Sequence, residues 1–218
     1  MKNRDYKEFA PNEIYHIYNR GVGKMKIFLD DQDYGVFISR LKENLFPEKV
    51  DDTKLSWLEK RRKLLPPDSF SLVSYCLMPN HFHLVIKQLT DLPIGKIILK
   101  VCTSYSMYFN KKYNRVGTVF QDQFKAVLVE NNGQLLWLSF YVHKNPLEAG
   151  LITEIEKYKW NSYLDYANLE NDSLCKKDLL LEQFKNPQSF ATHFKESLVS
   201  KEVNYKMVDM QDLFIDED

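Results

Sequence analysis

The sequence predicts an α+β domain in which three observations point to a ferredoxin-like split βαβ fold with an antiparallel four-stranded sheet. Segments rich in β-branched and aromatic residues lie at 13–20, 70–88 and 119–130. Segments with apolar residues at helical spacing lie between them, at 30–46 and 92–114. The composition, with 44% hydrophobic and 28% charged residues, is that of a globular protein. We expect helices on one face of the sheet, which leaves the other face for a ligand.

The first strand and the first helix are indicated by residue type and spacing. The stretch 13–20 combines β-branched and aromatic residues and stops at Gly21. Residues 30–46 open with acidic side chains, which suit the N-terminus of a helix. Apolar residues then recur at every fourth position, at Phe37, Leu41 and Leu45. This spacing predicts a helix with one buried face.

The next segment, 47–68, is charged and bounded by prolines, and we interpret it as an insertion that holds a short amphipathic helix. Two strands follow at 70–78 and 81–88. The turn residues Pro79 and Asn80 separate them, which predicts an antiparallel pair with a tight connection.

The second half supplies a long helix at 92–114, a strand within 119–130 and a further helix that begins at Asn131. We expect this last helix to end near Asn145, because a proline follows it at position 146. After Leu151 the chain becomes more polar, with one or two helices. We therefore divide the chain into a main domain at 1–166 and a helical tail with an acidic end at 167–218.

Composition excludes several classes of protein. No apolar run approaches the roughly 20 residues that span a bilayer, and the N-terminus lacks an apolar signal region, so we expect a cytoplasmic protein without a membrane partner. The three cysteines fit neither a disulfide framework nor a paired-cysteine zinc site. Residues 93–125 carry six basic residues and one acid, whereas residues 202–218 carry six acids and one base. The basic segment could neutralise phosphates or form a solvated helix face.

The stretch "MPNHFHLVI" at 78–86 places two histidines on one strand face. Side chains alternate along a strand, so His81 and His83 point to one side while Phe82 points to the other. The apolar side has the helix-covered core to face. The two imidazoles together suit ligation of one divalent ion, although such a pair also occurs as ordinary polar residues.

A second candidate motif is "FYVHKNP" at 140–146. Residues four apart on a helix are neighbours, so Tyr141 and Asn145 share a face. A phenol beside an amide oxygen offers a nucleophile and a third oxygen ligand, whereas the alternative is a packing aromatic. Tyrosine is a weak nucleophile at its free pKa of about 10 and needs activation of the phenol or of the phosphate that it attacks.

These motifs resemble those of the single-domain tyrosine transposases of the HUH superfamily, in particular the REP-associated tyrosine transposases. The stretches "SYSMYFNKKYNRVGTVFQDQFK" and "YVHKNPLEAGLI" share this resemblance. The resemblance covers about residues 15–166. It implies a strand transferase in which Tyr141 attacks a DNA phosphate to give a 5′-phosphotyrosine and a free 3′-OH. It also implies that His81, His83 and Asn145 bind Mg²⁺ or Mn²⁺, which polarises the phosphate. The implied partner is single-stranded DNA with hairpins, and the protein is a monomer or a homodimer.

The resemblance also implies DNA contacts. The family pattern "YHxxxRG" appears at 15–21 and contains Arg20, which could instead be a structural residue at a strand end. Further candidate DNA-binding residues are Lys112, Arg115 and Lys125. One departure is Gln123, because the family commonly has an arginine there. Lys125 could compensate.

Two other functions remain open. A domesticated protein of the same fold could bind hairpins without cutting them, although binding alone would not require both histidines, Tyr141 and Asn145. A metal-dependent or two-histidine phosphoesterase would require further ligands or a second H-x-[ST] motif. The other histidines, His16, His143 and His193, are expected to lack such partners.

Overall fold

The fold is an antiparallel four-stranded sheet with helices on both sides. The structure is a computed structural model that describes residues 8–51, 53, 64–167, 174–184 and 186–199. The strands are β1 (Ile14–Arg20), β2 (Phe70–Met78), β3 (His81–Gln88) and β4 (Lys125–Val129). They lie in the order β2-β3-β1-β4, and all paired strands are antiparallel. This order confirms the ferredoxin-like fold class.

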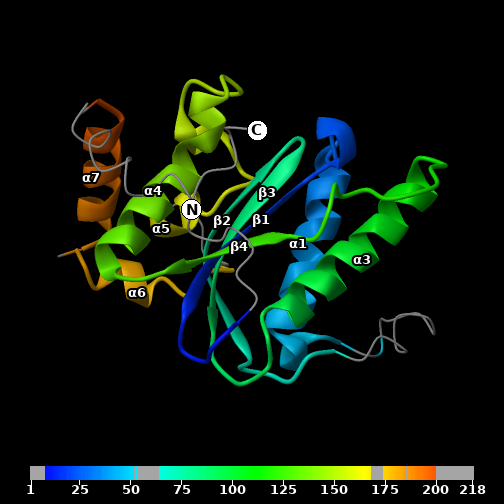
Figure 1. The fold of residues 1–218 in the computed structure, drawn as a ribbon. Helices are drawn as coiled ribbons and strands as arrows, with labels where there is room; N and C mark the ends of the chain where they lie inside the picture. Colours follow the sequence, from blue (N-terminus) through cyan, green and yellow to red (C-terminus); the bar gives the residue numbers. More distant parts are fainter. Residues whose placement is uncertain (1–7, 52, 54–63, 168–173, 185, 200–218) are drawn as a thin grey trace.

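Two helices cover one face of the sheet and a third covers part of the other. The main helices are α1 (Asp31–Leu45), α3 (Gly95–Lys112) and α4 (Asn132–Glu148), followed by α5 (Tyr163–Tyr166), α6 (Asp178–Leu181) and α7 (Pro187–Val199). Figure 1 shows α1 and α3 side by side on one side of the sheet, with α4 and the C-terminal helices on the other. The second face is therefore less open than we expected.

The apolar face of β3 packs on the α1 side. The ring centroid of Phe82 lies 5.1 Å from that of Phe37 in α1 and 5.9 Å from that of Phe120. All three side chains are buried. The alternation predicted for β3 is thus confirmed on its apolar side.

The helix α4 begins as predicted but runs further. The side-chain oxygen of Asn131 accepts a hydrogen bond from the backbone N–H of Gln134 at 2.9 Å, which caps the helix. The helix then continues through Pro146 to Glu148, so the expected end near Asn145 was wrong. A proline removes only its own N–H, and the next turn still closes because Ala149 N–H donates to the carbonyl of Asn145 at 2.9 Å.

The strand expected within 119–130 is shorter than predicted. Phe120 forms one isolated bridge with Gly21, and the regular pairing starts only at Lys125, opposite Tyr18. Between them the chain leaves the ladder, and the side chain of Asn19 donates to the carbonyl of Asp122 at 3.1 Å. A side-chain contact thus replaces backbone pairing here.

Some expectations lie outside the described residues. These are most of the helix in the insertion, at 54–63, and the acidic segment at 202–218. In the part of the chain that the structure describes, no helix is both long and apolar enough to cross a membrane.

Candidate active site

The register of the sheet gathers polar side chains on the face that α4 covers. Tyr18 of β1 pairs with His83 of β3, and Arg20 pairs with His81. Directly paired residues of antiparallel strands project to the same face. His16, two residues before Tyr18, therefore shares this face as well. Three histidines, a tyrosine and an arginine lie together at this end of the sheet.

The two histidines of "HFH" are adjacent and buried. Their ring centroids lie 5.0 Å apart with the ring planes at 83°, and the exposed fractions are 8% for His81 and 0% for His83. The Nδ1 atom of His81 lies 2.7 Å from the side-chain oxygen of Asn80. An oxygen there can only accept, so His81 carries its proton on Nδ1 and has a lone pair on Nε2.

His83 has its Nδ1 atom engaged by another histidine. Nδ1 of His83 lies 2.9 Å from Nε2 of His16, and the two rings stack with centroids 5.2 Å apart. Nε2 of His83 is buried and has no hydrogen-bond partner among the described residues. The sequence did not indicate that His16 lies at this site, because the pairing register that brings β1 beside β3 is not visible in the sequence.

The environment keeps His83 neutral. Burial lowers the pKa of His83 well below its usual value, and the neighbouring histidines and Arg20 lower it further. A metal-ligating histidine must be neutral. His83 therefore meets this requirement at neutral pH without losing a proton.

The helix α4 brings Tyr141 onto the same cluster. Its ring centroid lies 5.6 Å from that of His83, with the two planes at 90°, and the side chain is 2% exposed. One turn earlier, Trp137 stacks on Tyr141 with centroids 5.5 Å apart and nearly parallel planes. The phenol ring thus lies between the indole of Trp137, which is nearly parallel to it, and the imidazole of His83, which is perpendicular to it.

Asn145 lies one turn after Tyr141 and is buried. Its side-chain Nδ2 donates to the backbone carbonyl of Tyr141 at 2.9 Å. This bond ties the amide group to the turn that carries the tyrosine. The structure therefore brings Tyr141 and the two histidines together directly, and links Asn145 to them through α4.

The donor types at this site fit a divalent ion. Neutral imidazoles suit transition-metal ions, and an amide oxygen suits Mg²⁺ or Mn²⁺. Nε2 of His83, which has no hydrogen-bond partner among the described residues, is a nitrogen that a divalent ion would satisfy. In the described ranges, no cluster of three or more His, Cys, Asp or Glu side chains could hold a metal. The candidate metal site of His81, His83 and Asn145 is not a cluster of this kind, because its third ligand is an amide.

The four candidate DNA-binding residues divide between the two sides of the sheet. Arg20 and Lys125 lie on the face of the histidines, since Lys125 pairs with Tyr18. Lys112 ends α3, and its Nζ lies 2.7 Å from an oxygen of Asp30 and 2.8 Å from one of Asp33. These contacts join α3 to the start of α1 and lower the pKa of Asp30.

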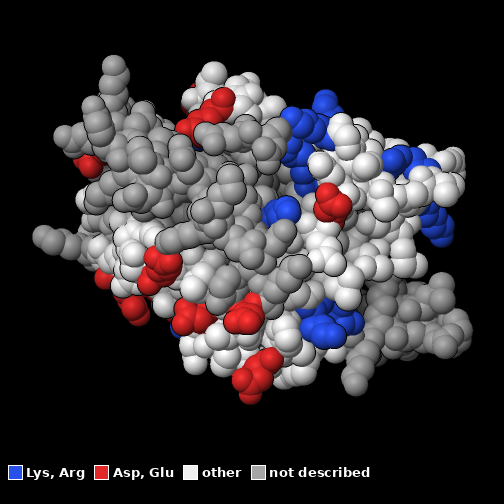
Figure 2. All heavy atoms as spheres, viewed as in Figure 1, with Lys and Arg blue, Asp and Glu red and all other residues white. Residues whose placement is uncertain are grey.

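Arg115 follows α3, and its guanidinium lies 5.6 Å from the ring centroid of Phe109. Figure 2 shows that lysine and arginine gather over the segment that follows β1 and over the end of α3, whereas acidic residues lie mainly toward the opposite end of this view. The basic region is thus wider than the site itself, and only part of it lies on the face of the histidines.

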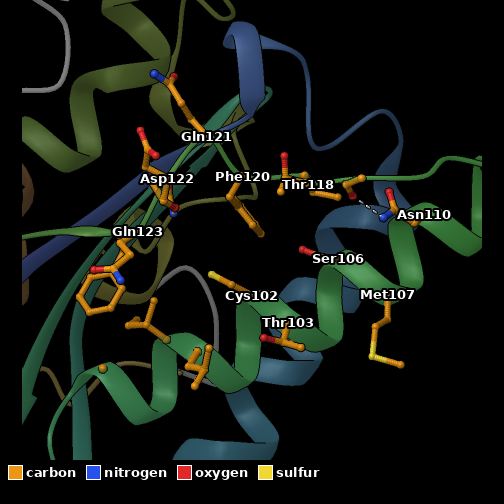
Figure 3. A pocket seen from close by; sticks show the side chains of 17 residues that line it. Cys102, Thr103, Ser106, Met107, Asn110, Thr118, Phe120, Gln121, Asp122 and Gln123 are labelled. Carbon is orange, nitrogen blue, oxygen red and sulfur yellow. Dashed lines mark hydrogen bonds between the residues drawn. The ribbon is translucent and has the colours of Figure 1, made fainter.

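A groove of about 820 Å³ lies between α3 and residues 117–124 (Figure 3). Gln123, which stands where an arginine was expected, lines it together with Asn19, Met107 and Phe120. Asn19 alternates with Tyr18 on β1, so the groove opens on the face opposite the histidines. The groove and the histidine cluster are separate features.

Comparison with known proteins gives the family of the chain and a protein of similar fold. Residues 36–145, half of the chain, match the family described as IS200-like transposases. The fold is similar to that of a REP-associated tyrosine transposase bound to a REP hairpin, with a TM-score of 0.56 and 10% identity over 78% of this chain and 89% of that one. A proposed transposase from Deinococcus radiodurans R1 has 11% identity over 62% of this chain and 91% of that one, with a TM-score of 0.38. No curated protein matches the sequence.

Proposed function

The chain belongs to the IS200-like transposase family, and from that premise we propose that it cuts and rejoins single-stranded DNA near hairpins, with Tyr141 as the nucleophile. The observation that carries this proposal is the contact between Tyr141 and His83, whose rings meet at 5.6 Å although they come from α4 and β3. A nucleophile next to a candidate metal ligand is the arrangement that attack on a phosphate requires.

The proposed reaction exchanges one phosphodiester for another. The phenol oxygen of Tyr141 bonds to phosphorus, and the bond from phosphorus to the 3′ oxygen of the preceding nucleotide breaks. The phenol loses one proton and the departing 3′ oxygen gains one, so no net proton is consumed. The products are a 5′-phosphotyrosine and a free 3′-OH. Attack by another 3′-OH reverses the step and joins the strands.

We assign the metal to His81, His83 and Asn145, through the two Nε2 atoms and the amide oxygen. Bound Mg²⁺ or Mn²⁺ would polarise the scissile phosphate as a Lewis acid. The protonation of the two histidines suits metal binding. His81 has its Nδ1 proton held by Asn80, and burial keeps His83 neutral.

The DNA partner is supported by the family and by the charges beside the site. Arg20 and Lys125 lie on the face of the histidines and would contact phosphates on either side of the cut. The solved relative of similar fold is bound to a REP hairpin. We therefore propose a hairpin-containing strand as the substrate, with Lys112 and Arg115 as more distant contacts.

Two observations favour a second function, in which the protein binds hairpins without cutting them. Tyr141 is only 2% exposed, so a phosphate reaches its hydroxyl only if the groups that cover it move. Gln123 also lacks the positive charge that an arginine would supply. Binding without attack would leave the tyrosine buried as it is.

Formation of a covalent adduct separates the two functions. We expect wild-type protein, incubated with hairpin single strands and Mn²⁺, to form an adduct that survives denaturing electrophoresis. Tyr141→Phe should form none while still binding the hairpin. A matched control is Tyr18→Phe, because Tyr18 is also buried and its ring lies 6.3 Å from that of His83. An adduct in Tyr141→Phe would rule out this nucleophile, and its absence in wild-type protein would favour the binding function.

A further inference from the structure

We propose that His16 is a positioning residue for His83. By accepting a hydrogen bond from Nδ1–H of His83, it would direct the lone pair of Nε2 toward the metal and toward Tyr141. This inference rests on the proposed function, because it assigns a role at the same site. It concerns a histidine that touches neither DNA nor the ion and acts only through its neighbour.

The contact between the two histidines is close and enclosed. Nε2 of His16 lies 2.9 Å from Nδ1 of His83, and the ring planes are within 10° of parallel. Both side chains are fully buried. His16 stands in the central strand β1, where its backbone pairs with Val85 on one side and Val127 on the other. The sheet therefore holds His16 firmly.

A single proton lies between these two nitrogens, and its position decides what His83 can do. If His16 donated, Nδ1 of His83 would accept, and the proton of His83 would be on Nε2, which has no partner among the described residues. A buried N–H without an acceptor is unfavourable, but the opposite direction also places one, on the buried Nδ1 of His16, so this cost alone does not choose between the two directions. If His83 donates instead, Nε2 carries a lone pair that a cation can satisfy. The second arrangement is the one that supports metal binding.

The pattern at His83 matches that at His81. Nδ1 of His81 meets the oxygen of Asn80, so both histidines have Nδ1 engaged by a neighbouring side chain and Nε2 left for another purpose. Metal-ligating histidines commonly donate their other N–H to a fixed acceptor, which orients the ring and raises its basicity. The two acceptors here are an amide oxygen and an imidazole nitrogen.

His143 shows what a buried histidine with a purely structural role looks like in this chain. It is also fully buried, and its Nε2 lies 2.7 Å from the hydroxyl of Ser162. Its ring neighbours are aromatic side chains of the C-terminal helices. The ring neighbours of His16 are instead Tyr18, His83 and Tyr141, all at the candidate site. His143 is therefore a matched control for burial and hydrogen bonding.

The test measures Mn²⁺ affinity by titration calorimetry on the full chain. His16→Phe keeps a ring but removes the acceptor, and we expect it to weaken Mn²⁺ binding by about 10- to 100-fold. His16→Gln places an amide oxygen near the position of Nε2 and should restore most of the affinity. His143→Phe should lower the thermal stability while it leaves the affinity close to that of wild-type protein. Equal affinity in wild-type protein and His16→Phe would overturn the inference.

A spectroscopic measurement tests the same claim without a variant. In metal-free wild-type protein, the side-chain ¹⁵N shifts of His83 should show the proton on Nδ1. A proton on Nε2 would overturn the inference even if His16→Phe fails to fold.

The variant His83→Ala distinguishes a wrong role for His16 from a wrong metal site. If His83→Ala binds Mn²⁺ as tightly as wild-type protein, the proposed metal site itself is wrong. If His83→Ala loses binding but His16→Phe keeps it, only the role of His16 is wrong. We expect both variants to lose affinity, with the larger loss in His83→Ala.

Discussion

The two faces of the sheet use neighbouring residues of β3 for different purposes. On one face Phe82 packs against Phe37 of α1, within an apolar core. On the other face His83 contacts both His81 and Tyr141 of α4. Both faces are buried, but only the second holds the cluster of histidines. Stability and chemistry can therefore be changed separately by substitutions one residue apart.

On the polar face, one nitrogen of each histidine has a hydrogen-bond partner. Burying a polar group is costly unless it is hydrogen-bonded. His83 and His16 bond to each other, and His81 bonds to Asn80. Nε2 of His83 is buried without a hydrogen-bond partner among the described residues, and it is one of the atoms assigned to the metal. On the face of Phe82, the buried side chain of Gln88 is hydrogen-bonded, and most of the other buried side chains are apolar.

The largest expected effect is the loss of cleavage when a histidine of the polar face is removed. We expect His81→Ala and His83→Ala to reduce cleavage of hairpin strands to the level seen with a chelator, because the metal then lacks a ligand. Timed cleavage of a labelled hairpin with Mn²⁺ measures this. Unchanged cleavage in either variant would remove that histidine from the metal site.

A substitution on the apolar face should act on stability instead. Phe82→Ala removes a fully buried ring, and such changes lower the free energy of unfolding by about 3–5 kcal/mol. Denaturant unfolding followed by circular dichroism measures the loss, with Phe82→Leu as the milder control. While folded, the variant should bind Mn²⁺ normally. A change in Mn²⁺ affinity as large as that in His83→Ala would mean that the two faces are not independent.

A third test concerns His143, which lies two residues after Tyr141 but packs among aromatic side chains. Burial lowers its pKa to about 3. The unfolded chain takes up this proton near pH 6.5 and the folded chain does not, so stability is lost as the pH falls below that value. Between pH 7 and pH 5 the contribution of this one group is about 2 kcal/mol.

We therefore expect His143→Gln to lose less stability than wild-type protein over this pH range, as measured by denaturant unfolding at each pH. His83 remains in both proteins and adds the same trend to each. Identical pH dependence in the two proteins would show that burial does not hold His143 neutral.

The smallest expected effect separates the basic residues of the two faces. Each phosphate contact contributes about 0.7 to the slope of log affinity against log salt for single strands. Arg20→Gln and Lys125→Gln should each reduce the slope by about this amount. Lys112→Gln should change it less, because Asp30 and Asp33 already hold that ammonium group. Fluorescence titration of a hairpin at several salt concentrations measures the slope, and a larger change in Lys112→Gln would reverse the assignment.

Much of this arrangement could be predicted from the sequence, because it depends on local periodicity. The order of strands and helices, the opposite directions of Phe82 and His83, and the cap at Asn131 all follow from spacing and residue type. The shared face of Tyr141 and Asn145 follows from their separation of four on a helix, whereas the roles expected of them follow from the family resemblance.

The rest depends on contacts between distant segments. The contact of His16 with His83 could not be predicted, because it requires the register of β1 against β3, which a sequence does not display. The continuation of α4 past Pro146 depends on a backbone bond beyond the proline. The ion pairs of Lys112 join residues about 80 positions apart, a separation at which charge patterns give no guide.

The most direct test of Tyr141 as a transferase nucleophile is the polarity of its DNA adduct. A hairpin single strand is labelled at its 5′ end in one sample and at its 3′ end in another, and each is incubated with the full chain and Mn²⁺. We expect only the 3′-end label to remain with the denatured protein, because a 5′-phosphotyrosine retains the downstream fragment, while the 5′-end label appears on a free strand that ends in 3′-OH. A covalent adduct that retains the 5′-end label would contradict the proposed reaction.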